Sequence, residues 1–356
     1  MNKDIKVTFP HLGSYCVPIE VLFRQGLDVE YITPPPITKR TLELGSRYSP
    51  DFVCAPFKYN LGNYIETIEL GANTIAQVGG ECRLGYYGEL HEQILCDLGY
   101  RIHFVNMAKG SFRKPLSFYE LFREINPEAN IRQIAAALRY VLKMVTFIDE
   151  FENEMRQNIG FERISGSYEG LHKEMMESFR KVSSIKEFHR IASVLEKQLR
   201  DIPTDKPKHP LRIGIIGEYY TIMEPFSNHF IEKEMAKRGI VVDRWMNISN
   251  SVFGLPIREM KETCGEYVRY NMGATSMATI SKALEFAKNR YDGLIHVKSF
   301  GCTPEMDAMP VLQNISKDYK IPILFFSFDS QTGEEGIQTR LEAFYDMIMM
   351  RKEASA

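Results

Sequence analysis

Short apolar runs alternate with amphipathic segments along the first part of the chain. Residues 3–9 alternate polar and apolar side chains, as a half-buried strand does, and residues 15–25 carry apolar side chains at helical spacing. The later segments follow the same order, with strands expected at residues 29–32, 51–54, 73–78 and 101–105 and helices at residues 38–45, 57–70 and 87–98. This regular β-then-α order predicts a parallel, doubly wound sheet.

The middle of the chain changes character before the alternation returns. Residues 130–157 and 168–199 are typical of long amphipathic helices, and residues 203–210 hold three prolines, as a linker does. The segments after the linker are strands at residues 212–216, 241–244, 293–297 and 322–328, and helices at residues 226–238, 275–290, 307–318 and 332–350. We therefore predict an α/β protein with two doubly wound parallel-sheet domains, residues 1–110 and 209–356, joined by a helical segment and linker over residues 111–208. Residues 249–274 give no clear pattern.

Charge and hydropathy narrow the class of protein. The formal net charge of −2 and a pI near 6.5 give no reason to expect a nucleic acid or an anionic membrane as partner. No apolar run reaches the ~18 residues of a membrane-spanning helix, and the amino terminus leads directly into a strand. We expect a cytoplasmic protein.

Several nucleotide and hydrolase motifs are absent from the sequence. There is no G-x-x-x-x-G-K-[ST] phosphate loop, no G-x-S-x-G elbow and no C-x2-C pair. Gly214 and Gly217 lack the third glycine of a dinucleotide-binding turn. The sequence therefore does not predict P-loop ATP binding, serine hydrolase chemistry, a zinc ribbon or a thioredoxin site.

Four of the six cysteines follow a predicted strand and stand at or near a helix start: Cys16, Cys54, Cys82 and Cys302. Open α/β sheets bind ligands at the carboxyl ends of their strands. Helix amino termini also favour thiolate over thiol. The alternative to a ligand role, for each cysteine, is that of a small buried side chain that only packs.

For three of these cysteines, the neighbouring residues support a role as ligands. Pro56 and Pro304 follow Cys54 and Cys302 and fix the turn around each sulfur. Cys82 is framed by three glycines that permit close approach of a bulky group, namely Gly79, Gly80 and Gly85. Cys16 has no such neighbours and fits an amphipathic helix equally well.

The positions of the other two cysteines favour a packing role. Cys96 lies within a predicted helix, where we expect it to pack with Ile94, Leu95 and Leu98, and Cys264 lies in the irregular stretch. The remaining histidine candidates are His11 and His296 near strand ends, as ligands or acids, although a packed or surface side chain is the favoured interpretation. Glu81, Arg83 and Glu305 flank the cysteines, as hydrogen-bonding partners of a bound group or as helix caps.

Dispersed thiolates without a nearby histidine pair favour an iron–sulfur cluster over zinc, because zinc sites usually bring a local pair of ligands. We expect a crevice between the domains, with Cys54 and Cys82 on one wall and Cys302 on the other. Three thiolates would leave one iron open to substrate or water, which separates a catalyst from an electron carrier.

Four segments resemble a known family: PPPITKRTLELGSRYSPDFVCAPFKYNLGNYIE, GGECRLGYYGELHEQIL, IIGEYYTIMEPFSN and DGLIHVKSFGCTPEM. They resemble the 2-hydroxyacyl-CoA dehydratase component family, and within it the activase-related, stand-alone branch with double-cubane relatives. The resemblance implies two flavodoxin-like domains with a 4Fe-4S cluster in the interdomain cleft, and thiolate ligands at Cys54, Cys82 and Cys302. Cys16 departs from the positions fixed in the family, so its ligation stays open.

The resemblance also implies partners and chemistry. Electrons of low potential would come from a separate ATP-hydrolysing iron–sulfur activase, and an acyl-CoA or other small molecule would be the substrate of an oxygen-sensitive component of anaerobic metabolism. We favour one 4Fe-4S cluster over an 8Fe-9S double cubane, because the latter needs all six cysteines, including Cys96. The catalytic residues stay unassigned.

Two other classes of function stay open at the level of the sequence. One is a non-catalytic cluster carrier, electron relay, maturation protein or scaffold, and the other is a metal-free two-domain binding protein whose cysteines only pack. A homodimer is the expected assembly, because it is the commonest among soluble proteins.

Overall fold

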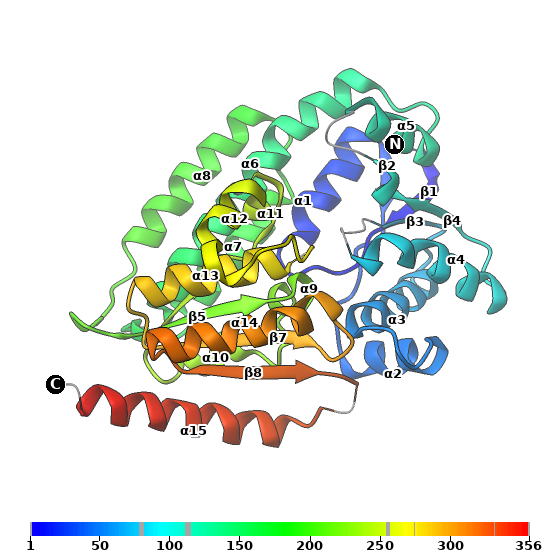
Figure 1. Cartoon of the computed structure of the whole chain (residues 1–356). Coiled ribbons are helices and arrows are strands. Elements are labelled where there is room, and N and C mark those ends of the chain that lie inside the picture. Colours follow the sequence, from blue (N-terminus) through cyan, green and yellow to red (C-terminus); the bar gives the residue numbers. More distant parts are fainter. Residues whose placement is uncertain are drawn as a thin grey trace. The chain divides into compact units, whose positions relative to one another are not determined.

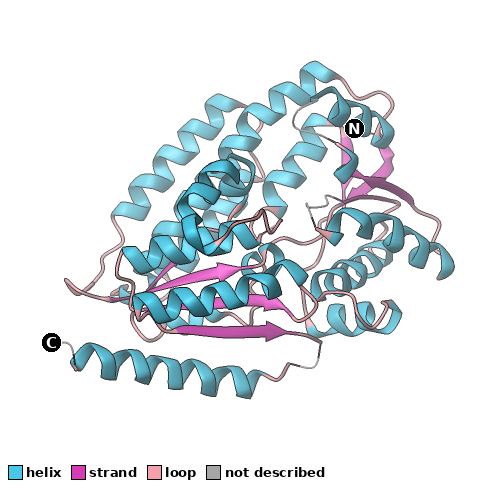
Figure 2. Ribbon diagram, viewed as in Figure 1, coloured by secondary structure: helices cyan, strands magenta, loops and turns pink. Residues whose placement is uncertain are grey.

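The computed structural model describes residues 2–77, 82–110, 115–253, 257–273, 275–330 and 332–354. Contacts divide the chain into two units. Unit 1 comprises Met1–Val53, Phe57–Phe151 and Gly166–Ile202, and unit 2 comprises Cys54–Pro56, Glu152–Ser165 and Pro203–Ala356. Each unit contains its own sheet, as Figures 1 and 2 show. The short piece Cys54–Pro56 thus belongs by its contacts to unit 2, although its sequence neighbours belong to unit 1.

Unit 1 is built on a four-stranded parallel sheet. Its strands are β1 Asn2–Thr8, β2 Val29–Tyr31, β3 Thr74–Gln77 and β4 His103–Asn106, in the order β2-β1-β3-β4. Its helices are α1 Cys16–Val21, α2 Lys39–Tyr48, α3 Ala55–Glu69 from its third residue on, α4 Tyr87–Asp97, α5 Pro115–Ile125, the first part of α6 Ile131–Asn158, α7 Ser167–Phe179 and α8 Ile185–Arg200. Single helical turns of other types are η1 Leu22–Gly26, η2 Arg83–Tyr86 and η3 Met107–Lys109.

Unit 2 repeats the same strand order. Its strands are β5 Leu211–Gly217, β6 Ile240–Arg244, β7 Gly293–Ser299 and β8 Ile323–Phe328, arranged β6-β5-β7-β8 with all pairs parallel. Its helices are the end of α6, then α9 Tyr219–Met223, α10 Ile231–Ala236, α11 Ile248–Phe253, α12 Ile257–Cys264, α13 Ser276–Lys288, α14 Thr303–Tyr319 and α15 Glu334–Glu353, with the turns η4 Ile159–Phe161 and η5 Gly265–Tyr267. Both sheets begin in the 2-1-3-4 order of flavodoxin-like folds. The predicted fold class, two parallel α/β sheets with many helices, is confirmed.

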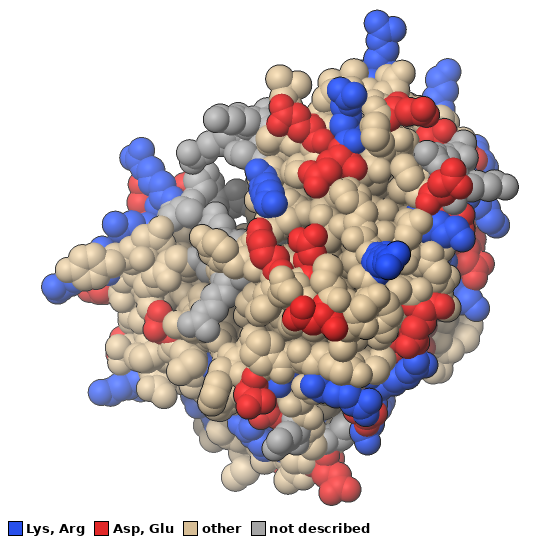
Figure 3. Space-filling view, turned by 90° about the vertical axis from the view of Figure 1, so that its right-hand side faces the viewer, with Lys and Arg blue, Asp and Glu red and all other residues tan. Residues whose placement is uncertain are grey.

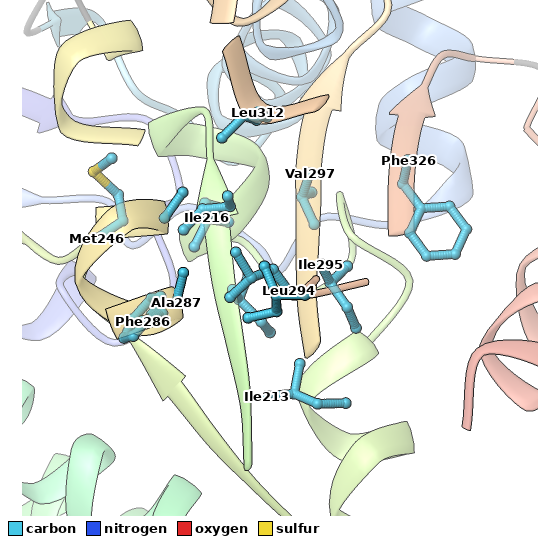
Figure 4. Packing of buried hydrophobic residues seen from close by; sticks show 14 of the residues in the cluster. Ile213, Ile216, Met246, Phe286, Ala287, Leu294, Ile295, Val297, Leu312 and Phe326 are labelled. Atoms are coloured by element: carbon cyan, nitrogen blue, oxygen red, sulfur yellow. The ribbon is translucent and has the colours of Figure 1, made fainter. Parts of the chain in front are cut away.

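Helices cover both faces of the unit 2 sheet. A Cβ at Gly214 of β5 would meet Phe286 of α13, whereas one at Gly293 of β7 would meet Phe344 and Ile348 of α15. All seven residues of β7 are buried, as expected of a central parallel strand. Figure 4 shows part of this core, with labelled side chains from β5, β7, β8, α13 and α14. Burial of this apolar cluster holds the carboxyl ends of β5 and β7 in a rigid frame.

The expected strand at residues 51–54 is wrong. Residues 51–53 form a turn and a bend, Val53 donates its N–H to the Pro50 carbonyl at 3.4 Å, and Phe52 is 90% exposed. The sheet of unit 1 pairs β1 with β2 and β3 on its two sides, so this short apolar run finds no place beside β1. Cys54 therefore follows a turn and directly precedes α3.

Three expected helices differ from the structure. The helix at residues 168–199 is two helices, α7 and α8, because Ser184 caps α8 and accepts the Glu187 N–H. The helix at residues 307–318 begins earlier, at Thr303, since a proline is tolerated in the first helical turn. The helix at residues 226–238 shrinks to α10, because His229 and Phe230 have positive φ. The stretch 249–274, which gave no clear pattern, holds most of α11 and all of α12. Val78, the end of one expected strand, lies outside the described residues.

The surface charge and the hydropathy of the helices agree with the near-neutral, ordinary composition of the chain. The face in Figure 3 carries acidic and basic side chains together. No helix within the described ranges is both long and apolar enough to cross a membrane.

Candidate functional site

The carboxyl ends of β5 and β7 form a topological switch point in unit 2. These neighbouring strands connect onward in opposite directions, β5 to β6 and β7 to β8. Open α/β sheets bind ligands in the crevice at such a point. Glu218 follows β5 there, Ser299 ends β7, and Cys302 is the N-cap residue of α14.

A glycine allows the two strand ends to approach closely. Gly217 has φ +135°, and a Cβ on it would lie 1.9 Å from the Val297 carbonyl oxygen. The next N–H, that of Glu218, donates to the same carbonyl at 3.0 Å. The Glu218 carboxylate then caps α9, accepting the N–H groups of Tyr220 at 2.8 Å and Thr221 at 3.1 Å. This half-buried carboxylate is thereby fixed beside the end of β7.

Ser299 connects the turns that carry Cys54 and Cys302. Its hydroxyl accepts the Ala55 N–H at 2.7 Å, and its carbonyl accepts the Cys302 N–H at 3.0 Å. Cys54 directly precedes Ala55, and its thiolate is close enough to Cys302 to raise the pKa of that thiol. Two of the four predicted cysteines are therefore neighbours within unit 2.

The surroundings of Cys302 disfavour a thiolate. Burial is the largest cause of its raised pKa, followed by the carboxylate of Glu218, with smaller contributions from Glu305 and Cys54. The backbone N–H of Glu305 acts in the opposite direction. A buried lysine lies nearby, since Lys298 donates to the carbonyls of Ser299 at 3.5 Å and Phe300 at 3.4 Å. Burial lowers the pKa of Lys298, and negative charge at Cys302 or Glu305 would raise it in part.

A buried hydrogen-bonded group lies behind Cys302. The Glu305 carboxylate is fully buried and accepts the hydroxyls of Thr275 and, at 3.0 Å, Thr279. Its second oxygen lies 2.8 Å from Nε2 of His296, a fully buried residue of β7. Of the roles left open for His296, the structure shows a packed side chain with Glu305 as its partner. This group joins α13, α14 and β7 directly behind the cysteine turn.

The thiol pair fits part of the metal site that the sequence predicts. Two adjacent thiols among carboxylates carry unfavourable negative charge as thiolates, which a bound cation would compensate. Within the residues that the structure describes, no group of three or more His, Cys, Asp and Glu side chains is arranged to hold a metal ion. Cys54 and Cys302, two of the three predicted ligands, lie close together.

Residues 130–348 match the family model of the 2-hydroxyglutaryl-CoA dehydratase D-component. This match covers more than half of the chain. The chain belongs to this dehydratase component family. The family resemblance seen in the sequence is thus confirmed, while no curated protein matches the chain.

The dehydratase family match covers the whole sheet of unit 2. It includes Glu218, Ser299 and Cys302, whereas Cys54 and Cys82 lie before it. The family assignment is therefore carried by the half of the protein that contains the β5–β7 switch point.

Cys82 and Cys16 of this dehydratase component lie in unit 1. Cys82 is exposed and directly precedes η2. Cys16 is buried as the first residue of α1, and its sulfur accepts the Leu12 N–H at 3.4 Å. Gly79, Gly80 and Glu81 lie outside the described residues, and the side chain of Arg83 is not described. The structure brings Cys54 and Cys302 together, and the ligand roles of all four cysteines stay predictions.

The expectations for the other thiols and for His11 divide. Cys96 is exposed, so its predicted packing is wrong: α4 buries Tyr87, His91 and Leu95, and Cys96 points away from that face. Cys264 is buried in the apolar core, where burial raises its pKa to about 11, and its packing is confirmed. His11 is half-buried and its backbone N–H donates to Asn63 Oδ1 at 2.9 Å.

Ser299, Glu218 and Lys298 were not singled out from the sequence of this family member. All three stand at the last residues of β5 and β7 or directly after them. Their position at a strand end was the available signal, because polar residues there face the ligand crevice of an α/β sheet.

Proposed function

We propose that this protein is an iron–sulfur component of the 2-hydroxyacyl-CoA dehydratase type, with a 4Fe-4S cluster bound by Cys54, Cys82 and Cys302. The observation that supports it is the pairing of Cys54 and Cys302 through Ser299 at the switch point of unit 2. Cys82 enters from the sequence, through its glycine neighbours and the family resemblance, and Cys16 is a fourth candidate only because it stands near a helix start. Membership of the dehydratase component family supports this class of chemistry.

The chain's own residues would bind the cluster and set its electrostatic environment. When bound, such a cluster supplies one-electron chemistry and, with three thiolates, an iron position open to another ligand. The backbone N–H of Glu305 favours the thiolate of Cys302. Carboxylates at Glu218 and Glu305 disfavour added negative charge beside the sulfur, so we expect a low reduction potential.

The first test is the metal content of anaerobically purified protein. We expect Cys54→Ser and Cys302→Ser to reduce iron and acid-labile sulfide by about tenfold or more, since loss of a supporting group alone costs about 10- to 100-fold in metal affinity. Cys82→Ser is expected to behave alike, and Cys96→Ser is the control because Cys96 is exposed on α4. Unchanged iron in both Cys54→Ser and Cys302→Ser would contradict the proposal.

The iron count also separates the two cluster types. About four iron atoms per chain indicate the single 4Fe-4S cluster that we favour, and about eight indicate the 8Fe-9S double cubane. The double cubane would require Cys96 and Cys264 as ligands, and burial of Cys264 in the apolar core weighs against it.

We further propose that a separate ATP-hydrolysing iron–sulfur activase reduces this cluster and that an acyl-CoA is the substrate. The test is the EPR spectrum after reduction by such an activase with ATP, before and after addition of acyl-CoA. A changed signal supports a substrate site beside the cluster. A reduced cluster whose signal no acyl-CoA changes favours the carrier or relay function.

A further inference from the structure

Ser299 makes two hydrogen bonds that point to two different cysteine-bearing turns. Its hydroxyl oxygen lies 2.7 Å from the Ala55 nitrogen, and its carbonyl oxygen lies 3.0 Å from the Cys302 nitrogen. Ala55 is the first residue of α3, so its N–H has no partner within the helix. Ser299 is only 1% exposed, and water is therefore a poor substitute for its hydroxyl.

One of the two bonds uses the side chain of Ser299 and the other its backbone carbonyl, and the residue itself is held rigidly. Ser299 ends β7, which is buried along its whole length and paired on both sides. The Cys302 turn closes on the carbonyl of Ser299, whereas the Cys54 turn is attached to unit 2 through its hydroxyl. The spacing of the two thiols therefore depends on a side chain that is itself no ligand.

We infer that the Ser299 hydroxyl is a positioning group that holds the Cys54 turn at the spacing from Cys302 that a shared ligand requires. The inference rests on the proposed function in that the shared ligand is a metal cluster. Ser299→Ala leaves both thiols in place but removes the acceptor for the Ala55 N–H. Ser299→Thr keeps a hydroxyl and is the conservative variant.

The same hydrogen bond can be removed from its other side. Ala55→Pro deletes the donor at a helix position that accepts proline, but its ring carbon replaces the amide hydrogen and lies against the Ser299 hydroxyl. The Ser299→Ala/Ala55→Pro double variant relieves that contact and is measured beside it. Ser281→Ala is the matched control, because Ser281 is equally buried in unit 2 and its hydroxyl has no hydrogen-bond partner among the described residues. Far-UV circular dichroism and thermal unfolding check that each variant is folded.

The first readout is the cluster in anaerobically reconstituted protein. We expect Ser299→Ala and Ala55→Pro each to weaken iron binding by about 10- to 100-fold, or to change the EPR signal of the cluster that still forms. The double variant should be no worse than either single one, because both remove the same bond. Ser299→Thr and Ser281→Ala should resemble the wild type.

The second readout needs no iron. Phenylarsine oxide binds pairs of neighbouring thiols, so its affinity for the metal-free protein reports the spacing of Cys54 and Cys302. We expect Cys54→Ser and Cys302→Ser to abolish the tight binding and Ser299→Ala to weaken it about tenfold, with Ser281→Ala unchanged.

The two readouts separate the possible failures. A wild type without iron that still binds the arsenical through Cys54 and Cys302 would sink the proposed function and leave the role of Ser299 standing. Wild-type affinity for the arsenical in folded Ser299→Ala and Ala55→Pro overturns the inference. If Ser299→Ala does not fold, Ala55→Pro decides, and if neither folds, Ser299 is a structural residue and the inference is wrong.

Discussion

Glu305 is a buried polar residue with several specific partners beside the cysteine pair. Its carboxylate accepts two threonine hydroxyls and faces His296, and all four residues are buried. Removal of one member of such a group leaves the others buried and unsatisfied, which costs more than the bonds themselves contribute.

We expect Glu305→Ala to lower the free energy of unfolding by about 3–5 kcal/mol, because it leaves Thr275, Thr279 and His296 without their acceptor. Glu305→Gln should cost clearly less, since an amide oxygen still accepts from the threonines. Urea-induced unfolding measures both, with exposed Glu259→Ala as control. Equal losses in the Ala and Gln variants would show that the acceptor is unimportant.

A buried histidine in unit 1 predicts a pH dependence. His91 has Nε2 3.0 Å from the Phe57 carbonyl and Nδ1 2.9 Å from the Gln77 side-chain oxygen, and burial lowers its pKa from 6.5 to about 3. As the pH falls below 6.5 the unfolded chain takes up this proton before the folded one does. The stabilisation is therefore complete above about pH 6.5 and is lost progressively toward about pH 3.

We expect His91→Gln to reduce the loss of stability between about pH 7 and pH 4.5 by about 2–3 kcal/mol, from the proton uptake of the unfolded chain over that interval. The measurement is the free energy of unfolding in urea at several pH values. His209→Gln, on the surface, is the control. A slope that His91→Gln leaves unaltered would mean that His91 is protonated in the folded state as easily as in the unfolded one.

At the scale of elements, α2 and α3 pack through two glycines. A Cβ at Gly62 of α3 would lie 1.9 Å from the Thr41 carbonyl oxygen, and one at Gly45 of α2 would lie 1.7 Å from the Lys58 carbonyl oxygen. The two helices therefore touch backbone to backbone. The helix expected to end at residue 45 continues to Tyr48, so Gly45 lies inside α2 and permits this close contact.

We expect Gly62→Ala to destabilise the protein by about 1–3 kcal/mol, because the added methyl group collides with backbone that has no room to move. Gly170→Ala in α7 should instead stabilise it by about 0.5–1 kcal/mol, since no atom lies within 4 Å of its Cβ. Thermal unfolding gives both signs. A neutral Gly62→Ala would mean that α2 and α3 separate at little cost.

At the scale of the whole molecule, two sheets of identical strand order are built from one chain. The contact units interleave, since Cys54–Pro56 and Glu152–Ser165 join unit 2 from within the sequence of unit 1. The domain limits expected from sequence, residues 1–110, 111–208 and 209–356, stay a prediction.

Cluster loading should raise the unfolding temperature of the wild type by a few degrees, because a ligand that binds only the folded chain stabilises it by mass action. Anaerobic scanning calorimetry before and after removal of iron by a chelator measures this shift. Cys302→Ser should show no shift, and Cys96→Ser should keep it. A shift of the same size in Cys302→Ser would place the metal elsewhere.

Short apolar stretches of the sequence predicted the strands that those stretches form. Residues 293–297 and 322–328 are mainly apolar, with His296 and Ser327 as their polar exceptions, and they form the buried β7 and the neighbouring β8. Residues 51–54 are similarly apolar, yet no sheet edge receives them, and the pattern cannot show that. Ser184 and Pro304 are local signals of a helix start. The apolar periodicity of the longer stretches around them nevertheless favoured one continuous helix in the first case and a later start in the second.

By itself, the sequence determined the two parallel α/β sheets and the dehydratase component family, because strand and helix periodicity and the family's motifs lie along short stretches of chain. Only the tertiary structure decided which cysteines meet. Cys54 and Cys302 are 248 positions apart, and their proximity depends on Ser299, whose two hydrogen bonds join turns that no local pattern relates. The physical reason is that packing of β5 against β7 creates the frame, and a single buried hydroxyl then fixes the Cys54 turn to it.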